Sequence, residues 1–196
     1  MPNRTQIVCL HEGKKGSSVD PIFINKVLKT LDPAWLRPWK GNNTIRIEPC
    51  GGRTELMARI PGELRRCLGM GGDTTLMVWA DLDHDMEDGE KLKEKFWQAT
   101  HSAEKSPQEA EITREQFDQV VFVFAKDRIE NWIEFLLFGA TDESMEGPRQ
   151  KHGRLAADAA KKLANRCLGR EPGPPLPPSL EWSCQNWRAL VERMSH

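Results

Sequence analysis

An apolar run that ends in regularly spaced aspartates constrains this chain more than any other stretch. Residues 76–80 (LMVWA) are apolar and lead directly into Asp81, Asp83 and Asp85. An unbroken apolar run of this length is typical of a strand that is buried on both faces of a parallel sheet. Because alternate residues of a strand share a face, we expect the aspartates to leave the carboxyl end of a central strand together.

The three carboxylates have two interpretations. Like charges at this spacing repel one another unless a cation lies between them, and hard oxygen ligands favour Mg²⁺, Mn²⁺ or Ca²⁺. Alternatively, residues 81–85 form an acidic loop that caps the following helix. The pattern favours the first interpretation, a metal site at the end of the strand.

Short apolar strands alternate with amphipathic segments along the first part of the chain. The pattern predicts strands at residues 6–10, 44–48, 76–80 and 119–125. Helices are expected at residues 20–31, 56–68, 89–101 and 127–137, and Pro61 is expected to break or kink the second. Four strands that are each followed by a helix predict an α/β fold, with a mostly parallel central sheet of about four strands flanked by helices.

The last part of the chain reads as helical. We expect an α/β domain at residues 1–140 and a helical C-terminal extension at residues 141–196, with a stiff proline-rich spacer at residues 171–178. Trp182 and Trp187 lie beyond the strand–helix alternation, and aromatic side chains are favoured in interfaces. We therefore expect this extension to help form a surface for a partner protein or for nucleic acid.

Composition excludes some classes of protein. Of the 196 residues, 38% are hydrophobic and 29% are charged, which is typical of a globular protein. No apolar run approaches the length of a membrane span, and the first residues lack the apolar core of a signal peptide, so no membrane role is expected. The five scattered cysteines include no C-x-x-C pair. They indicate reduced thiols and a cytoplasmic location, and argue against a zinc site or a disulfide framework.

Charge is unevenly distributed, although the net charge is only −1. Residues 81–94 are mainly acidic and residues 144–170 mainly basic. This asymmetry fits a metal site beside a phosphate-binding surface, and fits two solvated helix faces equally well. On the first interpretation the residues expected to contact nucleic-acid phosphates are Lys14, Lys15, Arg149, Lys151, His152 and Arg154.

Four motifs follow one another in a fixed order. They are His11-Glu12-Gly13 after the first strand, Gly51-Gly52, the D-x-D of Asp81 and Asp83, and Ile129-Glu130-Asn131-Trp132 after the last strand. This order resembles the Toprim domain of topoisomerases, bacterial primases and OLD-family nucleases. It is most similar to small stand-alone Toprim-like proteins, many of which are thought to belong to bacterial defence modules. The resemblance covers about the first 140 residues.

The resemblance implies a Toprim-like Rossmannoid fold and a set of site residues. Glu12 would act as acid/base or metal ligand, and Asp81 and Asp83 would bind Mg²⁺ or Mn²⁺. Asp85 and Glu130 are candidates for a second metal.

The chain departs from the family in two places. His11 replaces the usual aliphatic or acidic residue before the E-G pair. A family lysine that acts near the transition state has only possible matches, which are Lys126, Lys151 and Lys161.

Glu130 has a second, structural interpretation. Asp127 and Glu130 have the D-x-x-E spacing of a capping box, in which Glu130 would occupy the third helical position. The sequence alone leaves both roles open.

The expected function is therefore a divalent-metal-dependent endonuclease. The resemblance to OLD enzymes, together with the lack of a phosphate loop here, implies an ABC- or AAA-type ATPase partner and a role as the effector subunit of a bacterial defence module. The alternatives are a ribosomal-RNA-processing Toprim nuclease and a catalytically inactive Toprim-like interaction or regulatory module. The sequence leaves open a homo-oligomer and the choice between DNA and RNA.

Overall fold

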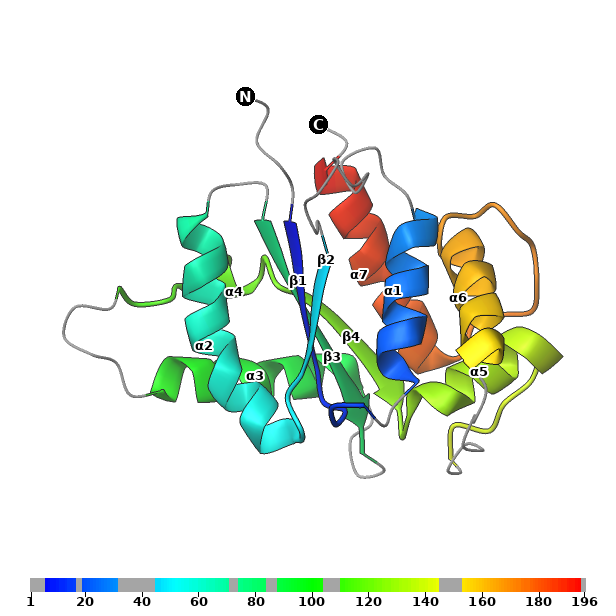
Figure 1. Cartoon of the computed structure of the whole chain (residues 1–196), viewed down its shortest axis with the longest axis horizontal. Helices are drawn as coiled ribbons and strands as arrows, with labels where there is room; N and C mark the ends of the chain where they lie inside the picture. The colour runs from blue at the N-terminus through cyan, green and yellow to red at the C-terminus, as the bar shows by residue number, and fades with distance from the viewer. Residues whose placement is uncertain are drawn as a thin grey trace.

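A parallel sheet forms the centre of the protein. The computed structural model describes residues 6–16, 19–31, 45–70, 74–83, 88–103, 110–144 and 153–194. Four strands pair in the order β2-β1-β3-β4, and every neighbouring pair is parallel. Helices cover both faces of the sheet, which gives a three-layer, Rossmann-like arrangement (Figure 1). The predicted α/β class with a four-stranded parallel sheet is confirmed.

The carboxyl ends of the strands gather at one edge of the sheet, at the bottom of Figure 1. The strands are β1 (Gln6–His11), β2 (Ile45–Pro49), β3 (Thr74–Leu82) and β4 (Val121–Lys126). His11 aligns with Pro49 of β2 and with Trp79 of β3. Where β3 pairs with β4, Leu82 aligns with Lys126. The loops that follow these residues therefore meet at one place, as in other open parallel sheets.

One face of the sheet is covered by α2 (Arg53–Gly69), α3 (Gly89–Ser102) and the short α4 (Arg114–Phe117). Their apolar side chains pack on alternate strand residues such as Leu10, Val78 and Phe122. Helix α2 continues through Pro61, so this residue does not break the helix, and a kink there stays a prediction. Proline removes one backbone hydrogen bond from a helix, and burial of the Pro61 ring offsets part of that loss.

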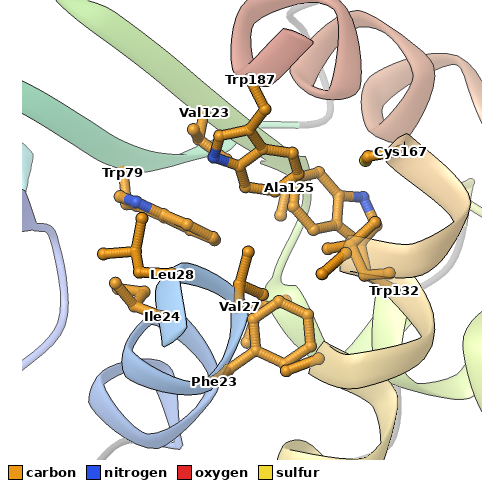
Figure 2. Packing of buried hydrophobic residues seen from close by; sticks show 14 of the residues in the cluster. Phe23, Ile24, Val27, Leu28, Trp79, Val123, Ala125, Trp132, Cys167 and Trp187 are labelled. Atoms are coloured by element: carbon orange, nitrogen blue, oxygen red, sulfur yellow. The ribbon is translucent and has the colours of Figure 1, made fainter. Parts of the chain in front are cut away.

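The other face is covered by α1 (Asp20–Leu31), α5 (Ile129–Phe138), α6 (Gly153–Cys167) and α7 (Pro178–Met194). Three tryptophans meet in this core, with ring centroids 5.4 Å apart for Trp79 and Trp187, and 6.3 Å apart for Trp132 and Trp187 (Figure 2). Trp187 is fully buried. The expected role of Trp187 in a partner surface is therefore wrong, because the ring completes the core.

Helix α6 belongs to this core as well. Ala156, Ala160 and Leu163 are fully buried in the cluster that contains strand residues of the sheet. The division into an α/β domain at residues 1–140 and a helical extension at residues 141–196 stays a prediction.

Helix α7 closes the outer edge of β4, the last strand in the sheet order. Ser183 Oγ accepts a hydrogen bond from the Phe124 backbone N–H at 3.1 Å and donates one to the Phe124 carbonyl at 3.4 Å. One turn earlier, Ser179 Oγ accepts from the Lys126 N–H at 3.3 Å. One turn later, the Asn186 side chain donates to the Phe122 carbonyl at 2.9 Å. Side chains of a helix thus satisfy backbone groups that a further strand would otherwise pair.

Trp182 attaches α7 to the layer that contains α2 and α3, on the face of β4 to which the Phe124 side chain points. Its ring stacks on Phe124, with centroids 5.1 Å apart and an interplanar angle of 8°. Its indole N–H donates to Glu90 at the start of α3 at 2.9 Å. Helix α7 therefore contacts both layers of the fold across the edge of the sheet.

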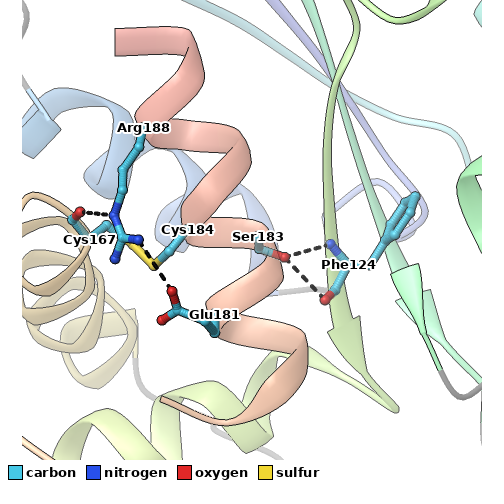
Figure 3. Close-up of a disulfide and its surroundings, with 6 residues drawn as sticks. All are labelled: Phe124, Cys167, Glu181, Ser183, Cys184 and Arg188. Atoms are coloured by element: carbon cyan, nitrogen blue, oxygen red, sulfur yellow. Dashed lines mark hydrogen bonds and ion pairs between the residues drawn. A yellow bond between two sulfur atoms is a disulfide. The ribbon is translucent and has the colours of Figure 1, made fainter. Parts of the chain in front are cut away.

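A disulfide joins α6 to α7. Cys167 and Cys184 are bonded, with their Cα atoms 5.2 Å apart (Figure 3). Arg188 reinforces this contact by donating to the Cys167 carbonyl at 2.7 Å and pairing with Glu181 at 3.2 Å. The expectation that all cysteines are reduced thiols is wrong, because helix packing brings together two residues that are 17 positions apart. A cytoplasmic location stays a prediction, without the support that the cysteines were expected to give.

Three cysteines, Cys9, Cys50 and Cys67, are unpaired. Among the helices in the described ranges, none has both the length and the apolar character needed to cross a membrane.

Candidate functional site

An arginine lies at the centre of the strand-end carboxylates. Arg53 Nη1 forms an ion pair with the Asp83 carboxylate. Arg53 Nη2 lies 3.3 Å from Glu12 Oε2 and also donates to the backbone carbonyl of Asp81. Glu12 Oε2 in turn accepts the backbone N–H of Asp81 at 3.2 Å. The guanidinium therefore supplies the positive charge that the sequence pattern led us to assign to a metal ion.

The turn before α2 fixes the position of Arg53, which is the first residue of the helix. Cys50 N–H donates to the His11 carbonyl at 2.8 Å, and Gly51 N–H donates to the Gly13 carbonyl at 3.1 Å. Gly51 has a φ of 91°, in the left-handed region that glycine adopts without steric penalty. The end of β2 is thus tied to the end of β1, which places Arg53 over Glu12.

His11 is buried beneath this layer, with only 1% of its surface exposed. Its Nδ1 lies 3.5 Å from Asp20 Oδ2 at the start of α1. Neither ring nitrogen of His11 has a hydrogen-bond partner within the described part of the chain, and the same holds for the indole nitrogen of Trp79. Buried polar atoms are rarely left unpaired, since this costs stability.

Both residues line a cavity of about 310 Å³ at the carboxyl edge of the sheet. The acidic residues in its wall are Glu12, Asp20 and Asp81, and Lys14 contributes an amine. The starts of three helices also reach the wall, through Asp20 of α1, Gly52 before α2 and Ile129 of α5. Helix N-termini carry partial positive charge and bind anions, phosphate included. The cavity therefore combines carboxylates that suit a cation with backbone groups that suit a phosphate.

Asp81 is the most strongly perturbed carboxyl of this cavity. Burial raises its pKa well above the ordinary value for an aspartate, and the neighbouring carboxylates of Glu12, Asp20 and Glu130 raise the pKa further. Arg53 acts on the same pKa in the opposite direction. The structure thus brings Glu130, from the start of α5, within electrostatic reach of Asp81.

The capping role expected for Glu130 is wrong. The N-cap of α5 is Arg128, so Glu130 occupies the second helical position rather than the third. The Arg128 side chain forms no capping hydrogen bond with the start of the helix. Asp127, the expected cap, instead adopts a left-handed φ of 57°. Its backbone N–H donates to the Leu82 carbonyl at 2.8 Å, which extends the pairing of β3 and β4 beyond the last strand residues.

The other expected site residues fall into two groups. Lys14 lines the cavity, and Lys15 is exposed nearby in the same loop. Asp85, Arg149, Lys151 and His152 lie outside the described residues, and so does the side chain of Arg154 at the start of α6. Contacts of these residues with nucleic acid stay predictions.

The donor atoms fit Mg²⁺ or Mn²⁺ in chemistry but not as a ready-made site. Within the described ranges, no group of three or more His, Cys, Asp or Glu side chains is arranged to hold a metal ion. Glu12 and Asp83 do converge on one cationic group, Arg53, and carboxylate oxygens are the ligands that these metals prefer. A metal at this edge of the sheet stays a prediction.

Sequence reasoning missed Arg53 and Asp20 as parts of the site. Asp20 is the first residue of α1, as the expected start of this helix at residue 20 implied. The available signal for Arg53 was its position directly after Gly51-Gly52, at a junction between a strand and a helix.

Comparison with known proteins does not test the Toprim resemblance. No protein-family model matches the chain, and neither a curated protein nor a solved structure matches it. The resemblance therefore rests on the order and strand-end positions of the motifs.

Proposed function

We propose that this protein is a divalent-metal-dependent nuclease of the Toprim type, which hydrolyses phosphodiester bonds at the carboxyl edge of its sheet. The observation that carries the proposal is the convergence of the Glu12 and Asp83 carboxylates and the Asp81 backbone carbonyl on a single cationic group. This group lies beside a cavity of about 310 Å³ that Glu12 and Asp81 line. Phosphodiester hydrolysis needs that combination, since positive charge must be held next to a scissile phosphate.

Each residue has a role in this proposal. Glu12, Asp81 and Asp83 would hold Mg²⁺ or Mn²⁺, and Glu130 and Asp85 would supply further ligands. When bound, such a metal lowers the pKa of a coordinated water and neutralises charge on the phosphate. Lys14 and the N-termini of α1, α2 and α5 favour the phosphate electrostatically from the cavity wall.

The proposal includes a partner. We expect an ABC- or AAA-type ATPase to act in trans and the pair to serve as a bacterial defence module, as the resemblance to OLD-family nucleases and stand-alone Toprim-like proteins implies. The basic residues 144–170 would then contribute to the path of the nucleic acid.

One observation favours a second candidate function, a catalytically inactive interaction module. Arg53 already neutralises Glu12 and Asp83 without a metal. An inactive relative of a Toprim nuclease would also need a group other than a metal to relieve the repulsion between its carboxylates.

Cleavage assays separate the two candidates. The purified protein is incubated with plasmid DNA, single-stranded DNA and RNA, in Mg²⁺, Mn²⁺ or EDTA, alone and with the ATPase of a neighbouring gene. We expect metal-dependent cleavage by the wild type and none by Asp83→Asn. The matched control is Asp118→Asn, which removes a carboxylate that pairs with Lys93 and Arg114, away from the cavity. Lack of cleavage under every condition would favour the inactive module.

A further inference from the structure

We propose that Arg53 is an exchange residue, which leaves Glu12 and Asp83 when a divalent metal binds them and then binds the phosphate of the nucleic-acid substrate. This inference rests on the proposed nuclease function. It assigns to Arg53 a substrate-binding role that the motif order did not include.

The first step follows from shared acceptors. Arg53 uses Glu12 Oε2, the Asp83 carboxylate and the Asp81 carbonyl, and two of these groups are expected metal ligands. Arg53 uses both oxygens of Asp83 and Glu12 Oε2, so a divalent cation competes with the guanidinium for the same oxygens, and the two positive charges repel each other. On this proposal, metal binding displaces Arg53 from these oxygens.

The second step follows from the chemistry of arginine. Its guanidinium remains charged at any pH at which a protein is folded, and its planar fork of N–H groups matches the oxygens of a phosphate. Once Glu12 and Asp83 bind a metal, Arg53 is left without these anionic partners. The phosphate of the bound substrate then takes their place.

The backbone is placed for such a move. Gly51 and Gly52, directly before Arg53, line the cavity, and the Gly51 N–H is held by the Gly13 carbonyl. The Arg53 side chain is only 19% exposed, beside Glu12 at 24% and Asp83 at 60%. The guanidinium can therefore turn from the carboxylates to a phosphate in the cavity while the start of α2 stays in place.

An independent observation concerns two buried residues of the cavity wall. His11 and Trp79 are 1% and 5% exposed and line the cavity, and their ring nitrogens have no hydrogen-bond partner among the residues that the structure describes. Unsatisfied polar atoms in two residues of the cavity wall support a ligand-binding role for this edge of the sheet.

The test compares the response of three proteins to Mn²⁺. The melting temperature of the wild type, Arg53→Gln and Arg59→Gln is recorded as Mn²⁺ is titrated into each metal-free protein. Arg59 is the matched control, because it lies in the same helix and pairs with Glu48 and Glu63, away from the cavity. Because a hydrogen-bonded charge pair is lost, we expect Arg53→Gln to reach half of its stabilisation at about tenfold lower Mn²⁺, and Arg59→Gln to match the wild type.

Steady-state cleavage tests the second step. At saturating Mn²⁺, kcat/KM of Arg53→Gln should fall at least about tenfold, since a charge-assisted contact to the phosphate is lost. Arg53→Lys keeps the charge without the fork and should lie between Arg53→Gln and the wild type in both assays. If Arg53→Gln does not fold, Arg53→Lys takes its place in the comparison.

The outcomes separate this inference from the proposed function. If Mn²⁺ stabilises the wild type and the Arg53 variants at equal concentrations, the exchange is wrong and the nuclease proposal stands. Tighter Mn²⁺ binding with unchanged kcat/KM overturns the phosphate contact. If Mn²⁺ stabilises none of the proteins, the proposed metal site fails, and the exchange fails with it.

Discussion

Ser183 in α7 forms two hydrogen bonds with the backbone of Phe124 in β4, one accepted at 3.1 Å and one donated at 3.4 Å. Phe124 lies in an edge strand, whose outward backbone groups would otherwise be available to another chain. The side chains of the C-terminal helix therefore complete the hydrogen bonding of β4 at the edge of the sheet.

The first prediction concerns this contact. Ser183→Ala leaves the buried Phe124 N–H without its acceptor, so the free energy of unfolding should fall by about 1–3 kcal/mol. Urea unfolding followed by circular dichroism measures the change. Ser102→Ala removes an exposed serine at the end of α3 and serves as the control. Equal stability of the two variants would contradict the role given to Ser183.

The second prediction concerns Trp187. Truncation of this fully buried ring leaves a cavity beside Trp79 and Trp132, so Trp187→Ala should lower the free energy of unfolding by about 3–5 kcal/mol. Phe138→Ala removes an aromatic ring that is 74% exposed and should change stability by no more than about 0.5 kcal/mol. If Trp187→Ala unfolds at the wild-type denaturant concentration, the ring does not belong to the core.

The third prediction concerns the disulfide between Cys167 and Cys184. Protein purified without reductant should have three titratable thiols after denaturation, those of Cys9, Cys50 and Cys67. Because the bond closes a loop across 17 positions, Cys184→Ser should lower the free energy of unfolding by about 3 kcal/mol. The half-buried and unpaired Cys50 provides the control, Cys50→Ser. Five titratable thiols in the unreduced wild type would show that the bond does not form.

The fourth prediction concerns Glu130, which contributes to the negative field at Asp81. Glu130→Gln should melt near the wild-type temperature in EDTA and lose part of the stabilisation by Mn²⁺, since a neutral amide is a poorer ligand for a hard cation. Glu134→Gln, one turn further along α5, removes a carboxylate that contacts Thr141 and is the control. A wild-type response to Mn²⁺ in Glu130→Gln would remove it from the ligand set.

The positions of the strands could be predicted from the sequence because each is a local pattern. The apolar run before Asp81 and the short strand before Glu12 indicate that both carboxylates leave strand ends. The pairing of β1 with β3, which makes these ends neighbours, is seen only in the structure. Helix N-terminal signals such as Asp20-Pro21 located α1 in the same way.

The remaining features depend on contacts between distant segments. Arg53 meets Asp83 across 30 positions, and Trp187 meets Trp79 across more than a hundred. Neither pair has a local signature, since an arginine at a helix start and a tryptophan in a terminal helix are both typical of exposed positions as well. The disulfide was missed for the same reason, because cysteine spacing carries no information on how α6 packs against α7.

Cleavage by Asp81→Asn tests the central claim most directly. The substitution keeps the shape of a side chain whose charge is disfavoured by burial and by neighbouring carboxylates, so the variant should fold and melt at or above the wild-type temperature in EDTA. The rate of cleavage of the preferred nucleic acid in Mn²⁺ is then measured for this variant and for the wild type. A metal-dependent nuclease that uses Asp81 as a ligand predicts a rate at least about a hundredfold lower than that of the wild type. Cleavage at the wild-type rate by folded Asp81→Asn would contradict the account.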